Sequence, residues 1–308
     1  MAAGLERTCW REMQVDHPAQ WELAVANQAE TPGRLTFSDR RHHRLDIKWR
    51  SIKYVPDLDL VLTRYKRRSK EDKIRYSDLS AAPSPWKGVV RKAADGTVVH
   101  AVRFYRDCRL LTDVAIVWPG RRDVGLEKSL LDSVRPRVED GEQLLWQAMG
   151  LSVHCPVGWD LRQSSRNVGR IQWDFHKMVA NDKIDRRAGM VRVERIAMPD
   201  ALLTGRSVRD WLVDELPAGF HALRQRTVPQ GRHSADELVS AAKRGLAARL
   251  TGNQQMMLDM AWLCPVEGRI YHVQFSQTRQ DEEIALPESW QVNCCKAAPV
   301  VRASRNAG

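Results

Sequence analysis

The stretch PAQWEL at residues 18–23 returns as PVGWDL at residues 156–161, and the match continues upstream, where MQVDHPAQWEL aligns with LSVHCPVGWDL. Further matches follow in the same order: GRLTF (33–37) with GRIQW (169–173), Pro56-Asp57 with Pro199-Asp200, and DVAIVWP (113–119) with DMAWLCP (259–265). A single matching phrase arises easily by chance, whereas several in the same order do not. We therefore interpret the chain as a tandem duplication.

The duplication predicts two homologous domains, covering residues 1–138 and 139–308. A chain of 308 residues agrees with this number, because one domain usually takes about 100–200 residues. The boundary is expected in PRVEDGEQ (136–143), where proline, glycine and acidic residues are typical of a connecting segment. The residues that anchor the alignment, and that we expect to be equivalent, are Pro18 and Pro156, Trp21 and Trp159, and Asp113 and Asp259.

Hydrophobic periodicity predicts an α+β fold for each domain. RLDIKWRSI (44–52) alternates apolar and polar residues, as a strand does, whereas the apolar residues of 58–65 recur with helical spacing. Asp57 and Ser207 are the expected N-caps of this helix and of a second one in SVRDWLVDEL (207–216). Further strands are expected in KGVVRK (87–92), TVVHAVRFYRD (97–107), RLLTDVAIVW (109–118), AARLTG (247–252), MMLDMAWLC (256–264) and RIYHVQFSQ (269–277), and a closing helix over 124–134. Strands grouped in runs favour a mainly antiparallel sheet packed with helices.

The element order around the repeated proline and tryptophan resembles a known family. An opening strand, a Pro-x-x-Trp motif, a meander, a helix, a second meander and a closing helix are similar to the Mog1/PsbP-like (DcrB-like) sandwich. The motif is carried by Pro18 and Trp21 in the first copy and by Pro156 and Trp159 in the second. The resemblance implies a helix-packed α+β sandwich and a noncatalytic role in binding or assembly.

The positive charge is compatible with an acidic partner such as nucleic acid, but a soluble surface of mixed charge is the better interpretation. The net charge is +11 with a pI near 9.6, although acidic and basic residues are interspersed through both halves. No run of 18 apolar residues occurs, so we expect no membrane-spanning helix. Charged residues in the N-terminal MAAGLERTCWREM argue against a signal peptide, and six scattered cysteines fit reduced thiols, so we expect a cytoplasmic protein.

Metal and cofactor sites are not expected from the sequence. The candidate ligands are His17, His42, His43, His154, Cys155, Cys264, Cys294 and Cys295. Structural zinc sites usually show two pairs of ligands spaced two to four residues apart, and this chain has only adjacent pairs such as Cys294-Cys295. Adjacent side chains of a strand point to opposite faces, so we predict buried thiols and neither a metal site nor a cofactor.

Catalytic residues are not expected either. The chain has no G-x-S-x-G motif and no G-x-x-x-x-G-K-[ST] phosphate loop. Asp113 and Asp259 stand inside expected strands, where a hydrogen-bonded structural role is the better interpretation. The sequence therefore predicts a protein that is not an enzyme.

The basic segment RYKRRSKEDKIR (64–75) is the strongest local charge feature. Its candidate partner-binding residues are Arg64, Lys66, Arg67, Arg68 and Lys70, although cations also suit the C-terminus of a helix. We predict a noncatalytic cytoplasmic binding or assembly protein with a protein partner. The alternatives are a nucleic-acid-associated protein that uses this basic stretch, and an enzyme with its site in the cleft between the two domains.

Overall fold

The computed structural model divides the chain into two compact units. Unit 1 comprises residues 1–139 and 146–150, and unit 2 comprises residues 140–145 and 151–308. The structure describes residues 4–27, 32–68, 75–80, 83–93, 96–137, 142–179, 183–185, 188–243, 253–279, 284–286 and 290–295. None of the helices in these ranges is long and apolar enough to cross a lipid bilayer. Each unit is described by itself.

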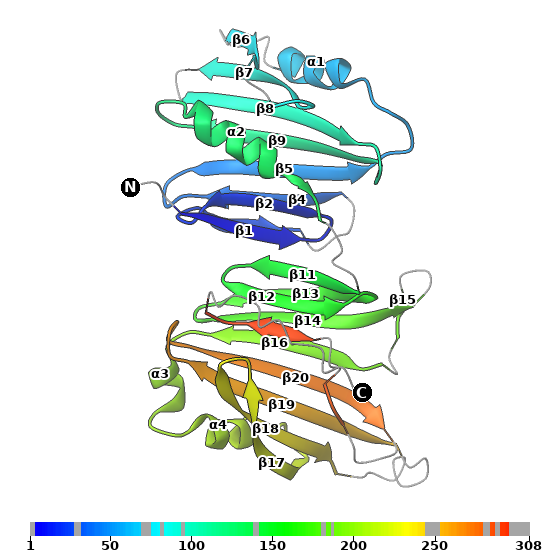
Figure 1. The fold of residues 1–308 in the computed structure, drawn as a ribbon, viewed down its shortest axis with the longest axis vertical. Helices are drawn as coiled ribbons and strands as arrows, with labels where there is room; N and C mark the ends of the chain where they lie inside the picture. Colours follow the sequence, from blue (N-terminus) through cyan, green and yellow to red (C-terminus); the bar gives the residue numbers. More distant parts are fainter. Residues whose placement is uncertain are drawn as a thin grey trace, which may run out of the picture. The chain divides into compact units, whose positions relative to one another are not determined.

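Unit 1 is built on a seven-stranded antiparallel sheet with the order β3-β4-β5-β9-β8-β7-β6. Its strands are β3 (Glu22–Ala26), β4 (Gly33–Ser38), β5 (His43–Ser51), β6 (Arg75–Asp78), β7 (Lys87–Ala93), β8 (Gly96–Tyr105) and β9 (Leu110–Trp118). Helix α1 (Leu58–Arg68) packs on β7 and β8, as Figure 1 shows. The side chains of Thr112, Val114 and Ile116 are buried on the opposite face from Asp113, because successive residues of a strand alternate.

A smaller layer in unit 1 contains β1 (Leu5–Trp10), β2 (Met13–Pro18) and β10 (Arg135–Pro136). Helix α2 (Val124–Ser133) packs on β2 and begins at Asp123, whose carboxylate accepts from the backbone N–H of Leu126. Cys9 of β1 lies opposite Gln147 of β11 (Gln143–Ala148). The indole rings of Trp10 and Trp146 meet edge to face, with their centroids 5.7 Å apart.

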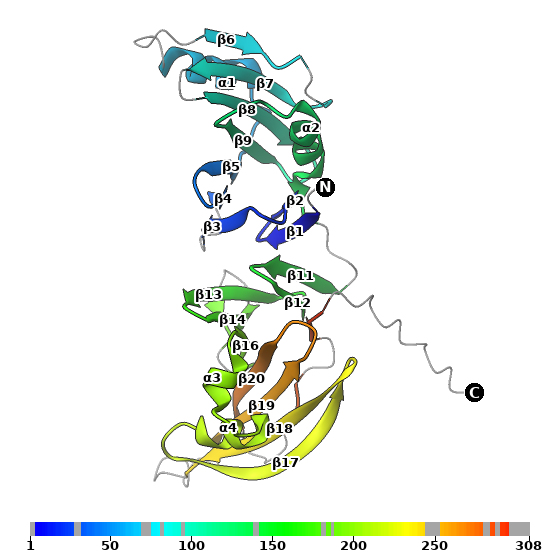
Figure 2. The ribbon, with the colours of Figure 1, turned by 90° about the vertical axis from the view of Figure 1, so that its left-hand side faces the viewer.

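Unit 2 is built on an eight-stranded antiparallel sheet with the order β13-β14-β16-β20-β19-β18-β17, to which β15 adds beside β14. The strands are β13 (Trp159–Asn167), β14 (Arg170–Val179), β15 (Lys183–Ile184), β16 (Met190–Ile196), β17 (Phe220–Gln230), β18 (His233–Ala242), β19 (Gln254–Cys264) and β20 (Arg269–Arg279). Helices α3 (Pro199–Leu203) and α4 (Val208–Asp214) precede β17, and β12 (Leu151–Pro156) pairs with β21 (Gln291–Asn293). Figure 2 shows β17 and β18 as a long hairpin.

The expected α+β class and the Mog1/PsbP-like sandwich are wrong. Strands make up most of the described residues, and the four helices described are 5–11 residues long. Segments of alternating apolar and polar residues form long strands. Two of them, β17 and β18, lie where the sequence predicted no element. The short helices cover only part of a sheet face, so each unit is mainly antiparallel β. The expected strand AARLTG (247–252) lies outside the described residues.

The large sheets of the two units share one strand order. The order in unit 1 is β3-β4-β5-β9-β8-β7-β6, and in unit 2 it is β13-β14-β16-β20-β19-β18-β17. When the strands of each sheet are numbered along the chain, leaving out the extra β15, the two orders are identical. The first hairpin matches in detail as well: Leu23 lies opposite Phe37, Leu161 lies opposite Phe175, and a bulge follows in each hairpin. Phe37 therefore corresponds to Phe175, and the match of GRLTF to GRIQW is displaced by two residues. The shared order supports the duplication, which we retain as a proposal.

The strand order also corrects the pairing of Asp113 with Asp259. Asp113 lies on β9, the counterpart of β20, whereas Asp259 lies on β19, the counterpart of β8. In unit 1, Asp113 lies between Lys48 and Val102, and in unit 2 His272 lies between Glu194 and Ala261. Asp113 therefore corresponds to His272, and by the same register Asp259 corresponds to His100. The two units carry an acid and an imidazole at exchanged positions.

Candidate functional site

The sheet face under α1 carries the candidate site of unit 1. The helix begins after Asp57, whose carboxylate accepts from the backbone N–H groups of Asp59 and Leu60 at 2.9 and 3.2 Å, as the sequence predicted. The side chain of Leu62 is buried against Val89 and Val102 of the sheet. Leu58, Val61, Tyr65 and Tyr76 pack around this core while remaining partly exposed. One side of the helix is thereby anchored, and the other side faces a pocket.

The pocket beneath α1 has a volume of about 360 Å³. It is lined by Pro32, Lys48, Trp49, Arg50, Val61, Arg64, Tyr65, Val102, Leu111 and Asp113. Its walls combine aliphatic and aromatic side chains with a few polar groups, which is the usual composition of a binding site. The volume lies within the range of about 300–1,000 Å³ that is typical of ligand pockets.

Asp113 is the acidic group of the pocket. The Tyr65 hydroxyl donates a hydrogen bond to its Oδ2. Burial raises the pKa of Asp113 to about 6, although the charge of Lys48 acts in the opposite direction. A carboxyl with this pKa changes charge in mildly acidic solution. The Asp113 carboxyl is therefore hydrogen-bonded to Tyr65, and its ionisation state depends on the pH.

His100 lies beside this pair. Its ring stacks on the Tyr65 ring, with centroids 4.5 Å apart and an interplanar angle of 22°. Burial, together with the charges of Arg91 and Lys48, lowers the pKa of His100 to about 4. The imidazole is therefore neutral at neutral pH and acts as an aromatic support for Tyr65.

Cations surround the pocket. Lys48 makes an ion pair with Asp46 at 3.0 Å. Arg50 and Arg64 are exposed, and within the part of the chain that the structure describes neither makes an ion pair. Among the described residues that line the pocket, none is a serine, threonine or cysteine. The exposed cations and the aromatic walls suit an anionic or aromatic group.

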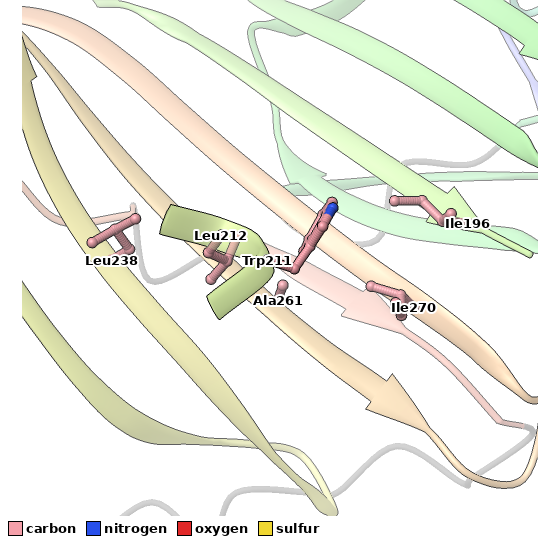
Figure 3. Close-up of a cluster of buried hydrophobic side chains, with 6 residues drawn as sticks. All are labelled: Ile196, Trp211, Leu212, Leu238, Ala261 and Ile270. Carbon is pink, nitrogen blue, oxygen red and sulfur yellow. The ribbon is translucent and has the colours of Figure 1, made fainter. Parts of the chain in front are cut away.

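The matching face of unit 2 is closed by packing. Trp211 and Leu212 of α4 are buried with Ile196, Leu238, Ala261 and Ile270 of the sheet, as Figure 3 shows. Val208, Trp211 and Leu212 have the spacing of Leu58, Val61 and Leu62 in α1. Trp211 therefore stands where α1 has Val61, and its ring centroid lies 5.5 Å from that of His272.

A buried ionic network lies under α4. His272 Nδ1 is 2.9 Å from Glu194 Oε2, and its Nε2 is 2.9 Å from Asp259 Oδ1. Burial alone would lower the pKa of His272, but the hydrogen bonds and charges of Asp259 and Glu194 raise it to about 9. The Gln274 amide also donates to Asp259 at 2.9 Å. These hydrogen bonds hold the imidazole between the two carboxylates, whereas Asp259 Oδ2 is buried without a hydrogen-bond partner among the described residues.

The residues singled out in the sequence meet this site only in part. Arg64 borders the pocket, whereas Lys66 points to an ion pair with Asp78 at 3.1 Å. The side chains of Arg67 and Arg68, and all of Lys70, lie outside the described residues. Lys48 and His100 were missed, because each occupies an ordinary position in an alternating strand. Tyr65 carried a usable signal, since it is the one residue of the apolar stripe with a polar end.

The repeated anchors are buried or partly buried. The exposed fractions of the side chains of Trp21 and Trp159 are 3% and 6%. Arg44 lies over the Trp21 ring at 5.2 Å, and the Trp159 ring meets that of Trp290 edge to face at 5.3 Å. Both tryptophans belong to the packing of their units and carry no part of the pocket.

Comparison with known proteins gives only distant similarity. No protein-family profile matches the chain, and no curated protein matches it. Among solved structures, the chain is similar to the apo immunity protein TplEi of the T6SS from Pseudomonas aeruginosa, with 12% identity, a TM-score of 0.39 and coverage of 94% of this chain and 97% of that one.

Two further structures show similarity of the same degree. TplEi in complex with the "L" peptide has 10% identity and a TM-score of 0.38, covering 94% of this chain and 93% of that one. The Tle4–Tli4 complex has 11% identity and a TM-score of 0.37, covering 90% and 87%.

Proposed function

We propose that this chain is a noncatalytic protein that binds a protein partner, and that unit 1 receives an acidic segment of that partner in the pocket under α1. The observation that carries the proposal is the pair Arg50 and Arg64 at the pocket, each exposed and without an ion pair among the described residues. A partner carboxylate can pair with these guanidinium groups while an adjacent side chain enters the pocket.

The surroundings of the pocket favour a protein over other partners. The segment that joins β5 to α1 exposes Tyr54 by 83% and Val55 by 66%, and Leu60 of the helix is 52% exposed. Exposed aromatic and aliphatic side chains beside arginine are typical of residues that carry protein–protein binding energy. Nucleic acid would instead require a row of cations that follows a phosphate backbone. Of the basic residues in the last turns of α1, Lys66 is already paired with Asp78.

In its narrowest form, the proposal gives the chain an immunity role, in which it binds a toxic protein and blocks its action. The net charge of +11 favours association with an acidic protein, because complementary charge raises the rate of encounter. The first candidates to test are the proteins encoded beside this chain in its genome. Binding alone supports the broader proposal, and loss of toxicity on co-expression supports the immunity role.

The test uses the purified partner, identified by affinity capture and mass spectrometry, and titration calorimetry with the full chain. The double variant Arg50→Glu/Arg64→Glu should weaken binding at least about tenfold, or about 1.4 kcal/mol. The matched control is Arg40→Glu/Arg121→Glu, which changes the net charge equally at two exposed sites outside the pocket lining. Equal affinities of the two variants would place the interface elsewhere. Tight binding of an oligonucleotide and of no protein would overturn the proposal.

A second variant tests the pocket without changing charge. Val61→Trp places an indole where unit 2 has Trp211 and should fill the pocket. We expect partner binding to fall while the unfolding transition stays in place. Retained binding by a folded Val61→Trp chain would show that the partner does not enter the pocket.

A further inference from the structure

Unit 2 contains a second cluster of reactive side chains, away from the network under α4. The cluster consists of His233, Cys264, Cys294 and Cys295. One ligating atom of each residue lies within 4.8 Å of the corresponding atoms of the others. We propose that these four side chains form a structural zinc site of the Cys3His type, which fastens the segment around β21 to the main sheet of unit 2.

The ligand set matches the chemistry of zinc. Three thiolates and one imidazole are among the standard sets of closed, tetrahedral zinc sites. With Zn–S near 2.3 Å and Zn–N near 2.1 Å, neighbouring ligand atoms of a tetrahedron are about 3.5–3.8 Å apart. Cys295 Sγ lies 3.5 Å from His233 Nε2. The upper limit of 4.8 Å for the group requires only a small contraction around an ion.

The fold brings the four residues together from distant parts of the chain. His233 begins β18 and Cys264 ends β19. These strands are antiparallel with Asp236 opposite Ala261, and the same register continued to the strand ends sets His233 opposite Cys264. Two ligands thus come from neighbouring strands of one sheet, which is a rigid basis for a metal site.

Cys294 and Cys295 come from the opposite side of the site. They follow β21, which pairs with β12 through Val153 and Val292. The sequence argument against zinc assumed that adjacent cysteines lie on one strand and point apart. The strand instead ends at Asn293, and Cys295 has a φ of 42°, in the left-handed region. This turn of the backbone lets both neighbouring side chains reach the same cluster.

Groups around the ligands support the site. The Trp262 indole N–H donates to Cys294 Sγ at 3.2 Å, and a donor to sulfur stabilises a thiolate ligand. Glu267, in the turn between β19 and β20, accepts from the backbone N–H of Cys295. The Tyr271 hydroxyl donates to the other oxygen of Glu267 at 2.6 Å. These contacts orient the cysteines from outside the cluster, as outer partners do in known metal sites.

The first experiment measures metal in the full chain, purified under reducing conditions without a polyhistidine tag. Mass spectrometry of the elements should find one zinc per chain. Replacement by Co²⁺ should produce the absorption bands of a tetrahedral, thiolate-bound ion. Zinc should also raise the unfolding temperature, and a chelator should lower it, because a ligand of the folded state stabilises it.

Variants of the ligands decide whether these four residues are responsible. Cys295→Ser and His233→Ala should lose the zinc and the cobalt spectrum. Trp262→Phe, which removes only the N–H donor, should weaken zinc binding about 10–100-fold. The matched controls are Cys155→Ser and Cys108→Ser, one buried and one exposed, both outside the cluster. Circular dichroism of each variant checks that the sheet is intact.

Three results would overturn the proposal. The first is a reduced, folded chain without stoichiometric zinc and without a cobalt spectrum. The second is zinc content that is unchanged in Cys295→Ser and His233→Ala. The third is a disulfide between two of the three cysteines in the native protein, found by peptide mapping without reduction, because a disulfide removes the thiolates that zinc requires.

Discussion

Helix α1 of unit 1 and helix α4 of unit 2 cover the same face of sheets that share one strand order, yet α1 borders a pocket and α4 buries a tryptophan and a leucine against the sheet. The two helices present residues of equal spacing to the sheet. At the middle position α1 has Val61, which leaves the pocket open, and α4 has Trp211, which is 1% exposed. This difference in side-chain volume accompanies the difference between a pocket beside α1 and a packed core under α4.

The polar groups beneath the helices differ in the same way. Unit 1 holds Asp113 and His100 apart, joined through Tyr65, whereas in unit 2 the imidazole of His272 bonds directly to Glu194 and Asp259. Exchanging an acid for an imidazole joins the second set by two direct ion pairs. On the proposed function, the polar groups of unit 1 meet a partner, whereas those of unit 2 bond to one another.

The largest expected effect tests the packing under α4. Trp211→Ala should lower the free energy of unfolding by about 3–5 kcal/mol, because it removes a buried aromatic side chain. Val61→Ala should cost about 1 kcal/mol or less, since this side chain already faces the pocket. Denaturant unfolding measures both. Equal losses of unfolding free energy would mean that α1 and α4 pack equally tightly on their sheets, which would contradict the difference between the two units.

The next effect concerns the pH dependence of stability. Asp113 has its pKa raised from 3.8 to about 6 by burial, so its contribution to stability is lost as the pH rises across that range, by about 2–3 kcal/mol. His272 has its pKa raised from 6.5 to about 9, since Asp259 and Glu194 outweigh burial, so its contribution is complete below pH 6.5 and is lost toward pH 9.

Two variants separate these windows in unfolding curves measured across pH. Asp113→Asn should remove the change in stability between about pH 4 and 6 and keep the change between about pH 6.5 and 9. His272→Gln should have the opposite effect. His272→Gln should also lower stability at neutral pH, because it leaves two buried carboxylates without their partner. A profile that neither variant alters would show that these groups ionise as they do in the unfolded chain.

The smallest expected effect concerns the helix starts. Ser207 forms a capping box with Asp210 at the N-terminus of α4, and Asp57 accepts from two backbone N–H groups of α1. Ser207→Ala and Asp57→Ala should each cost about 1 kcal/mol. Thermal unfolding checks the values, and Asp57→Ala should in addition weaken partner binding by loosening the helix over the pocket. Unchanged binding would separate the cap from the site.

Local features were predicted well because they depend on neighbouring residues. The helix spacing of 58–65, the caps Asp57 and Ser207, and the closing helix α2 all appear as expected. The predicted α+β fold class was wrong because a few short helices were taken as evidence for a complete helical layer. The pairing of Asp113 with Asp259 was wrong because similar phrases recur on adjacent strands, and only hydrogen-bonded register identifies the matching strand.

The sequence by itself determined the repeated Pro-x-x-Trp motif, the alternating strands and the helix N-caps. Each of these features depends only on residues that lie a few positions apart in the chain. Tertiary structure alone decided which side chains meet. It placed Arg50 of β5 and Arg64 of α1 at one pocket, and His233 beside Cys295 across more than sixty residues of chain. Contacts of this kind depend on strand order and register, which are set by the packing of the whole sheet and not by any local pattern.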